Sequence, residues 1–547
     1  MKRHTPFRCA TLCLVALAAA SAQIKPDPRF PHLAKRGAAT QLIVDGKPWL
    51  ALGAELNNSS ASSLEYMRPL WPKLAASNIN TVLATVSWEL IEPEEGRFDF
   101  SLVDGLIQDA RRNNLRLVFL WFGSWKNGKS TYQPLWVKTN PERFPLVRNK
   151  PGQSLPILTP LSDANRDADA RAFAALMRRI REVDQGAHTV LMMQVENEVG
   201  ILDDSRDRSP AANKAFAGPA PKELMDYLQK HKDTLIPELR KRWEAAGFKT
   251  SGTWEEVFGT GPETDELFMA WNYARYMGRV AAAGKAEYPL PMFVNAWLRQ
   301  TGDQKPGGYP SGGPLPHVMD AWRAGAPAID FLSPDIYVAN FADWCAWYTQ
   351  SGNPLFIPES RGDARGVANG IYAIGKHDAI GYSPFGIDRS AGPDTELARA
   401  YAVLSQVAPL ILENQGQGTM SAVVLEKENP ARKLRLGNYT IEARFSTRSF
   451  GPPAATPASV ADRVAGLFIS VGPDDYVIVG RSMNVYFASA SDQSQSVGLG
   501  TVEEGSYVNG RWVAGRRLNG DETPEWRALR FPGDRYSIQR VKLYRYR

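Results

Sequence analysis

The sequence contains few cysteines and no second long hydrophobic run, and these two absences narrow the kind of protein it can be. Of its three cysteines, Cys9 and Cys13 lie in an N-terminal segment that we expect to be removed, which leaves Cys345. A single cysteine cannot form an internal disulfide, so the fold must rely on large hydrophobic cores. Beyond the first segment, no run approaches the roughly 18 apolar residues of a membrane-spanning helix. The sequence therefore favours a globular protein with no membrane partner once that segment is cleaved.

Clusters of like charge and metal-binding patterns are also missing. The 64 Lys and Arg residues nearly balance the 58 Asp and Glu residues, so the formal net charge is +6. Without a basic block, no nucleic-acid partner is predicted. The six histidines show no metal-ligand spacing, and no glycine-rich phosphate loop or dinucleotide fingerprint occurs, so we expect neither a metal nor an organic cofactor. His317, in GGPLPHVMDAW, is expected to begin a helix and to bond a backbone group.

The first 22 residues have the pattern of a secretory signal peptide. MKRHTPFR is a basic n-region, CATLCLVALAAA is an apolar h-region, and Ala20-Ser21-Ala22 is a small-residue cleavage site. A transmembrane helix is the alternative, but the apolar run is too short for one. We therefore expect cleavage after Ala22 and a periplasmic or secreted protein.

Between about residues 40 and 412, short apolar runs alternate with longer amphipathic stretches, as is typical of β/α units. A hairpin with the two-residue turn Asp45-Gly46 opens this region. We predict an α/β fold with a catalytic (β/α)8 barrel, a TIM barrel, over residues 23–412, and a mostly helical insertion at 200–290 after the fourth strand. The eight strand candidates are LALGAE (50–55), NTVLATV (80–86), LRLVFLWF (115–122), TVLMMQVE (189–196), PMFVNAW (291–297), AIDFLSPDIY (328–337), NPLFIPE (353–359) and AIGYSPF (379–385).

From residue 413 the pattern changes to short alternating strands with glycine-rich turns. YTIEARF, GLFISV, DYVIVG and VYFASA are examples. We expect residues 413–547 to form an all-β sandwich domain.

Polar and aromatic residues gather where the predicted barrel strands end. In such barrels the working residues lie at the carboxyl ends of the strands. Cleaving a glycosidic bond needs paired carboxylates, and amides and aromatic rings can hold the sugar. This composition therefore favours a glycoside hydrolase. The residues at these ends are Glu55, Asn57, Asn58, Trp88, Glu89, Trp121, Trp125, Glu196, Asn197, Glu198, Asn295, Trp297, Asp335, Tyr337 and Glu359.

Two carboxylates stand out among them. Glu359 closes NPLFIPE, an otherwise apolar strand, where a charge is costly unless it is paired or functional. Glu198 follows TVLMMQV and sits beside Asn197. Alternation along MMQVENE places Glu196 on the same face as Glu198, so the pattern alone does not separate these two. In a purely structural alternative, each carboxylate only accepts hydrogen bonds from loop amides.

At this point a resemblance to a known family becomes visible. VLMMQVENEVG resembles the acid/base strand of the retaining β-galactosidases of glycoside hydrolase family 35, in clan A of the (β/α)8 hydrolases. VSWELIEPEEGRFDF (86–100) is similar to the strand-two loop shared by families 35 and 42. The C-terminal β domain resembles the extra domain of some bacterial family-35 members. WFGSWKNG and IPESRGD depart from the family's commoner motifs at the third and seventh strands, so the resemblance assigns no sugar contacts to these two segments.

The resemblance implies roles for individual residues. In this clan the acid/base Glu directly follows an Asn at the end of strand four, and the nucleophile is a Glu that ends strand seven. The resemblance therefore assigns Glu198 as the acid/base and Glu359 as the nucleophile. Asn197 is expected to hold the sugar's 2-hydroxyl, and Tyr337 is expected to hydrogen-bond Glu359 because strands six and seven are neighbours.

Further sugar contacts are expected around this pair. Tryptophans that follow strands are predicted to face the sugar, with Trp88 and Trp125 at the rim. The substrate-binding candidates beyond Asn197 and Tyr337 are Glu55, Trp88, Trp121, Asn295 and Trp297.

Together with the signal-peptide pattern, the resemblance predicts an exported retaining exo-β-galactosidase. It would release single β-linked galactose units from plant oligosaccharides such as xyloglucan fragments, by double displacement. The same mechanism on a β-glucoside, β-xyloside or α-L-arabinoside is one alternative. A non-catalytic carbohydrate-binding protein is another, although a binder has no need of both Glu198 and Glu359. The sequence leaves the oligomeric state open.

Overall fold

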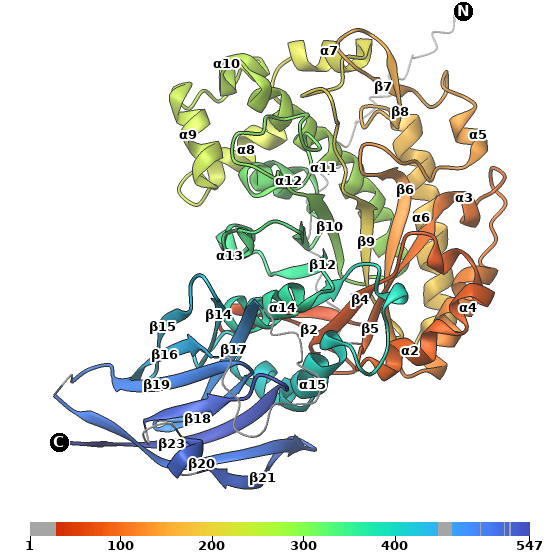
Figure 1. The fold of residues 1–547 in the computed structure, drawn as a ribbon. Coiled ribbons are helices and arrows are strands. Elements are labelled where there is room, and N and C mark those ends of the chain that lie inside the picture. Colours follow the sequence, from red (N-terminus) through yellow and green to blue (C-terminus); the bar gives the residue numbers. More distant parts are fainter. Residues whose placement is uncertain (1–28, 447–461, 493, 519, 524–526) are drawn as a thin grey trace, which may run out of the picture.

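Eight parallel strands close into a barrel in the computed structural model, which describes residues 29–446, 462–492, 494–518, 520–523 and 527–547. Each strand pairs with the next one along the chain and the last pairs with the first, which confirms the (β/α)8 prediction (Figure 1). In chain order the strands are β4 (Ala51–Glu55), β5 (Thr81–Ser87), β6 (Arg116–Lys126), β9 (Val190–Asn197), β10 (Met292–Trp297), β11 (Phe331–Ile336), β12 (Phe356–Ser360) and β13 (Gly381–Pro384).

The barrel strands are apolar along most of their length because they are covered on both faces. One hydrophobic cluster takes residues from seven of these strands and from Ile380, which directly precedes β13; Phe122, Phe293, Phe331 and Phe356 are its largest buried members. The barrel is therefore a packed core, and only the ends of its strands are free to form a site.

Helices connect the strands on the outside of the barrel. The long helix α6 begins where the Ser162 side chain accepts the backbone N–H of Asn165. The connecting helices are α1 (Leu64–Met67), α2 (Leu70–Ala76), α3 (Trp88–Ile91), α4 (Ser101–Arg112), α6 (Asp163–Asp184), α11 (Pro262–Glu287), α12 (Met319–Gly325), α13 (Phe341–Tyr348), α14 (Ala364–His377) and α15 (Glu396–Asn414).

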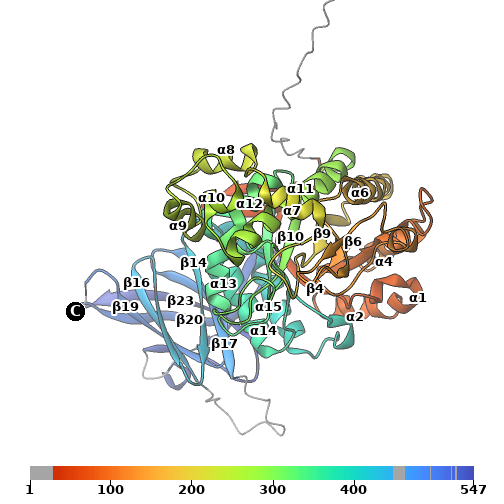
Figure 2. The same ribbon diagram turned by 90° about the horizontal axis from the view of Figure 1, so that it is seen from above.

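Two connections are extended. The segment between β6 and α6 contains α5 (Leu135–Lys138) and the hairpin β7 (Leu146–Arg148) and β8 (Ser154–Leu158). Four helices lie between β9 and α11, within the predicted insertion, and they gather at the upper part of Figures 1 and 2. These helices are α7 (Pro210–Ala217), α8 (Lys222–Lys230), α9 (Pro237–Ala245) and α10 (Trp254–Phe258).

A small antiparallel sheet precedes the barrel. It consists of β1 (His32–Arg36), β2 (Ala39–Val44) and β3 (Lys47–Trp49). Asp45 and Gly46 both have positive φ, 51° and 72°, as a tight hairpin turn requires, which confirms the predicted turn. The stretch PWLALGAE forms two strands rather than one, because β3 pairs with β2 whereas β4 enters the barrel.

The C-terminal region consists of two antiparallel sheets. The six-stranded sheet has the order β14 (Met420–Glu426), β17 (Arg463–Gly472), β18 (Asp475–Gly480), β23 (Ser537–Tyr546), β20 (Ser496–Val508), β21 (Arg511–Leu518). The four-stranded sheet has the order β15 (Ala431–Leu436), β16 (Tyr439–Phe445), β19 (Met483–Ser489), β22 (Ala528–Phe531). Side chains of both sheets share one hydrophobic cluster, as in a β-sandwich.

The larger sheet packs its other face against α14 and α15 (Figure 1). Gly375 of α14 allows the close approach, because a Cβ there would lie 2.4 Å from Leu467 Cδ1 and 2.7 Å from Ala422 Cβ. Glu396 of α15 adds an ion pair to Arg481, at 2.8 Å, and accepts a hydrogen bond from Tyr536. The two parts therefore share a buried interface.

The predicted signal peptide, residues 1–22, lies outside the described residues. Within the described part of the chain, no helix has both the length and the hydropathy needed to cross a bilayer.

Candidate active site

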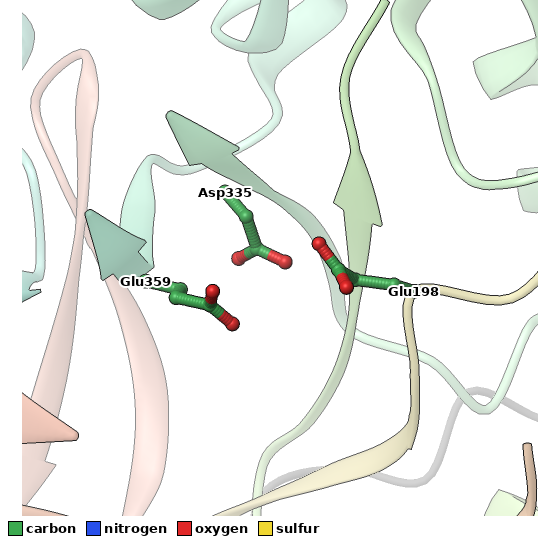
Figure 3. A group of neighbouring side chains, drawn as sticks. All are labelled: Glu198, Asp335 and Glu359. Carbon is green, nitrogen blue, oxygen red and sulfur yellow. The ribbon is translucent and has the colours of Figure 1, made fainter. Parts of the chain in front are cut away.

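Three carboxylates converge at the carboxyl ends of the barrel strands. Glu198 directly follows β9, Asp335 belongs to β11 and Glu359 to β12, and all three side chains are buried. One carboxylate oxygen of each lies within 4.8 Å of the others, and Figure 3 shows the side chains pointing toward one another. The fourth and seventh barrel strands thus bring together two glutamates that are far apart in the sequence, as the predicted pair requires.

A buried lysine accompanies the carboxylates. Lys126 is the last residue of β6, and its ammonium lies 3.5 Å from Oε2 of Glu198. Burial alone would lower the pKa of Lys126, but the surrounding carboxylates, Glu198 and Glu359 foremost, raise it above its ordinary value. Lys126 is therefore a cation next to Glu198, Asp335 and Glu359, which together form the acidic pocket. Three carboxylates at this spacing could also hold a divalent cation.

The sequence prediction missed Lys126 and did not select Asp335. Both residues carry the signal that identified Glu359, namely a charge at the end of an apolar strand. A search for any charged residue at the end of an apolar strand, whether acidic or basic, would have found both Lys126 and Asp335.

The carboxylates influence one another's ionisation. Burial, followed by the charge of Glu198, raises the pKa of Glu359 to about 7, and Lys126 and a hydrogen bond from Tyr337 oppose the rise. Burial and the charge of Glu359 raise the pKa of both Glu55 and Asp335. Burial and mutual repulsion therefore favour the protonated forms of these acids, and ionisation of one of them hinders ionisation of the others.

Asn295 connects the ends of three neighbouring strands. Its Oδ1 accepts the backbone N–H of Glu198 at 3.0 Å, and its Nδ2 donates to Asn197 Oδ1 at 3.1 Å and to Asp335 Oδ2 at 2.7 Å. Asn197 also accepts a hydrogen bond from Gln194, whereas its own Nδ2 has no partner among the described residues. Asn197 therefore has a donor to offer a bound molecule, and Asn295 fixes the amide that carries it.

Tyr337 and Glu55 also belong to the group around Glu359. The Tyr337 hydroxyl donates a 2.7 Å hydrogen bond to Glu359 Oε1, which confirms the contact expected from neighbouring strands. Glu359 Oε2 has no hydrogen-bond partner within the described structure. Glu55 ends β4 and is buried, and its charge acts on the same carboxylates. Both residues are thus at the predicted site.

The structure separates Glu196 from Glu198, contrary to the expected shared face. Glu196 and Glu198 have positive φ, 62° and 47°, which interrupts the alternation of an extended strand. Glu196 is fully buried and accepts the backbone N–H groups of Ser124 at 3.0 Å and Trp125 at 2.8 Å. Its carboxylate thus supports the end of β6, and Glu198 alone reaches the acidic pocket.

Three of the predicted sugar-facing tryptophans are core residues. Trp88, Trp121 and Trp125 have no exposed surface, so the prediction that they stack on a sugar is wrong. Rings from other helices cover them: Trp136 of α5 packs on Trp88, Phe173 of α6 on Trp121, and Tyr276 of α11 on Trp125. A strand-end position alone does not reveal that cover. Each indole donates inward: Trp88 to Glu92 Oε2 (2.8 Å), Trp121 to Asp169 Oδ1 (2.9 Å) and Trp125 to the Leu158 carbonyl (3.0 Å).

Trp297 differs from these three. It ends β10, two residues after Asn295, and is only half-buried. The Lys129 ammonium lies 5.9 Å from its ring centroid. Trp297 is therefore the tryptophan among the four that retains a surface for a sugar ring.

Two family models match parts of the chain. Residues 70–275 match the model of glycoside hydrolase family 42, described as β-galactosidase. Residues 397–530 match a domain of unknown function, DUF5597, which spans α15 and most of the C-terminal sheets. The first match includes Glu198, and neither includes Asp335 or Glu359.

A protein sequence and several solved structures are similar to part of the chain. A β-galactosidase of Xanthomonas manihotis is 28% identical over 199 residues, which are 35% of this chain and 30% of that protein, so the alignment covers under a third of the relative. The structure of a β-galactosidase from Rahnella sp. R3 is 16% identical, with 67% of this chain and 57% of that one covered and a TM-score of 0.46. The structure of a β-mannanase from the mussel Mytilus edulis is 12% identical, with 69% of this chain and 96% of that one covered and a TM-score of 0.41. Residues 70–275, which form the barrel from α2 into α11, are therefore similar to the β-galactosidases of glycoside hydrolase family 42.

Proposed function

We propose that the protein is a retaining exo-β-galactosidase that removes terminal β-galactosyl residues from oligosaccharides. The observation that carries the proposal is the approach of Glu198 and Glu359, whose carboxylate oxygens come within 4.8 Å of each other. Retaining glycosidases hold their two carboxyl groups about 5–5.5 Å apart, whereas inverting enzymes need about 6.5–9.5 Å for an intervening water. The short distance supports direct attack by one carboxylate.

In this mechanism Glu359 attacks the anomeric carbon and forms a covalent galactosyl-enzyme. Its Oε2 is the oxygen suited to attack, because Oε1 already accepts the Tyr337 hydrogen bond. Glu198 protonates the leaving oxygen and then removes a proton from the incoming water. Asn197 donates its free N–H to the 2-hydroxyl, and Asn295 holds both Asn197 and the Glu198 backbone in place.

A polar hollow beside this site suits the rest of an oligosaccharide. Its volume is about 660 Å³. Phe385, one of its lining residues, forms a backbone β-bridge with Glu55 of the site. Asn58 Oδ1 has no partner among the described residues, so a sugar hydroxyl could donate to it. The lining consists of Asn57, Asn58, Ser59, Ser60, Ser62, Ser63, Tyr66, Phe385 and Arg389.

The remaining details rest on the sequence. The proposed placement in family 35 rests on the resemblance of VLMMQVENEVG at strand four. The family-42 model also matches this segment, and it supports the coarser assignment to a β-galactosidase. Galactose-capped plant oligosaccharides such as xyloglucan fragments are the substrates we propose on that resemblance. Export to the periplasm or medium follows from the signal-peptide pattern of residues 1–22.

Azide rescue tests the assignment of both glutamates. Glu359→Ala should lose turnover of aryl β-galactosides by at least about a thousandfold, and azide should restore it with the α-galactosyl azide as product. Glu198→Ala should still form the intermediate from activated aryl galactosides, and azide should then give the β-galactosyl azide. Near-normal activity of Glu359→Ala would contradict the nucleophile assignment.

A panel of aryl glycosides tests the sugar. Faster hydrolysis of the β-xyloside, β-glucoside or α-L-arabinoside than of the β-galactoside would keep the mechanism and change the substrate. Release of longer oligomers before free galactose would contradict the exo mode.

A further inference from the structure

A second cavity lies in the helical part of the chain, away from the acidic pocket. Its volume is about 580 Å³, within the usual range of small-molecule sites. It is formed by α9, the end of α10, the start of α11, the loop after β10 and the short helix η2 (Pro316–Val318). In Figure 1, α9 and α10 lie at the upper left. None of the residues that line it is Glu198, Asp335 or Glu359.

The cavity has a buried carboxylate that is only half satisfied. Glu266 is 1% exposed, and its Oε2 accepts the Tyr309 hydroxyl at 3.0 Å and lies 2.9 Å from His317 Nε2. The partner of His317 is thus a carboxylate rather than the expected backbone group. Glu266 Oε1 has no partner among the described residues. A buried acceptor without a donor is unfavourable, so a ligand hydroxyl that donates to it would be stabilised.

The wall of the cavity carries an arginine that no ion pair within the described residues neutralises, among the cations Lys241, Arg242, Arg299 and Lys305 and the carboxylates Glu238, Glu263 and Glu266. Arg242 and Lys305 both pair with Glu263, at 3.7 Å and 3.3 Å. Arg299 has no carboxylate within ion-pairing distance among the residues the structure describes. Arg299 lines the same cavity as Glu266, Tyr309 and His317. An anionic group on the ligand would pair with Arg299.

Part of the remaining lining is apolar, beside the polar residues Glu238, Lys241 and Gln304. Leu239, Phe258, Leu267 and Val318 are all buried and line the same cavity. They form a surface on which the C–H face of a small ring can pack. The cavity therefore combines an anion-binding group, a hydroxyl acceptor and an apolar face.

We propose that this cavity binds a sugar acid of one or two rings, with its carboxylate on Arg299, a hydroxyl on Glu266 Oε1 and its C–H face on the apolar lining. A neutral sugar lacks the group for Arg299, and a simple aliphatic acid lacks the hydroxyl for Glu266. The proposal does not depend on the β-galactosidase activity, because no residue of the acidic pocket takes part.

Calorimetric titration of the full chain tests the proposal, with D-galacturonate and D-glucuronate as probes. Galacturonate should bind at least roughly tenfold more tightly than its uncharged methyl ester or than galactose, as expected for the loss of one charge-assisted hydrogen bond. Equal binding of acid and ester, or no binding of either acid at millimolar concentration, would overturn it.

A matched pair of variants locates the binding. Arg299→Met should weaken galacturonate binding by roughly tenfold. Arg240→Met, on the exposed side of α9 and outside the cavity lining, removes the same charge and should leave binding unchanged. If both variants weaken binding equally, or if neither does, the cavity is not the site. The comparison of acid and ester on the unaltered protein decides the matter if Arg299→Met does not fold.

Discussion

The hydroxyl of Tyr337 donates a 2.7 Å hydrogen bond to Oε1 of Glu359, from the strand next to it in the barrel. The bond favours the ionised carboxylate, and it opposes the burial and the Glu198 charge that together raise the pKa of Glu359 to about 7. A nucleophile must be ionised to attack. Tyr337 therefore helps to keep Glu359 active near neutral pH, and it leaves Oε2 free for the anomeric carbon.

Tyr337→Phe should shift the acidic limb of the pH profile of kcat/KM to higher pH. Loss of the hydrogen bond raises the pKa of Glu359, so a higher pH is needed to ionise it, and we expect a shift of about half to one unit. Initial rates on 4-nitrophenyl β-D-galactoside across the pH range measure this. Tyr546→Phe, at an exposed position of β23, is the matched control. An unchanged acidic limb in Tyr337→Phe would contradict the role.

Lys126, like Tyr337, opposes the rise in the pKa of Glu359 and offers a second test of that effect. Its positive charge lowers the pKa of Glu359, so Lys126→Met should also move the acidic limb to higher pH, on the order of one unit. Lys126→Arg keeps the charge and should restore most of the original profile. The same rate measurements compare the two variants. If the Met and Arg variants have the same pH profile and differ only in Tm, the lysine has a packing role alone.

The sequence predicted the barrel well because parallel strands covered on both faces read as continuous apolar runs. The ends of these runs then located Glu359 and the pair Glu196 and Glu198, from which the family resemblance selected Glu198. The closure of the barrel brings Glu198 and Glu359 together. The turn at Asp45-Gly46 was equally readable, because few dipeptides accept two positive φ angles. These features depend on local pattern and on strand order alone.

Other features of the site depend on local backbone and on packing between distant segments. The positive φ angles of Glu196 and Glu198 break the alternation that the prediction assumed. The burial of Trp121 depends on α6, which follows the extended connection from β6 and whose Phe173 packs against the ring. No property of the strand itself reveals that cover. Asn295 was placed at the site, but its bonds to three strand ends arise only once β9, β10 and β11 are adjacent.

Glu196 and Glu198 should respond oppositely to truncation. Glu196→Ala leaves the buried N–H groups of Ser124 and Trp125 without an acceptor, so it should lower the free energy of unfolding by about 2–5 kcal/mol. Glu198→Ala should remove activity on substrates with poor leaving groups and leave stability nearly unchanged. Thermal denaturation combined with rates on activated and unactivated galactosides separates the two effects, with the exposed Glu65→Ala as control. Azide-dependent product from Glu196→Ala would reverse the assignment.

Glu359→Gln should stabilise the folded protein at alkaline pH and not at acidic pH. The folded-state pKa of Glu359 is raised from 4.5 to about 7, so the folded protein holds this proton more tightly than the unfolded chain does. Stability is therefore lost as the pH rises through the window between these two values, because a buried carboxylate must then ionise. Glutamine does not titrate, so the variant escapes a loss of about 3 kcal/mol at most.

Calorimetric Tm values at about pH 4 and about pH 8 measure this difference, because these values lie below and above the titration window. The variant should exceed the unaltered protein in Tm at the higher pH, and the two should converge at the lower pH. Glu142→Gln, at an exposed position, controls for the removal of one negative charge and should change Tm little at either pH. An equal Tm gain at both pH values would show that better packing, rather than escape from ionisation, stabilises Glu359→Gln. A Tm loss at the higher pH would mean that the ionised Glu359 is net stabilising through Lys126 and Tyr337.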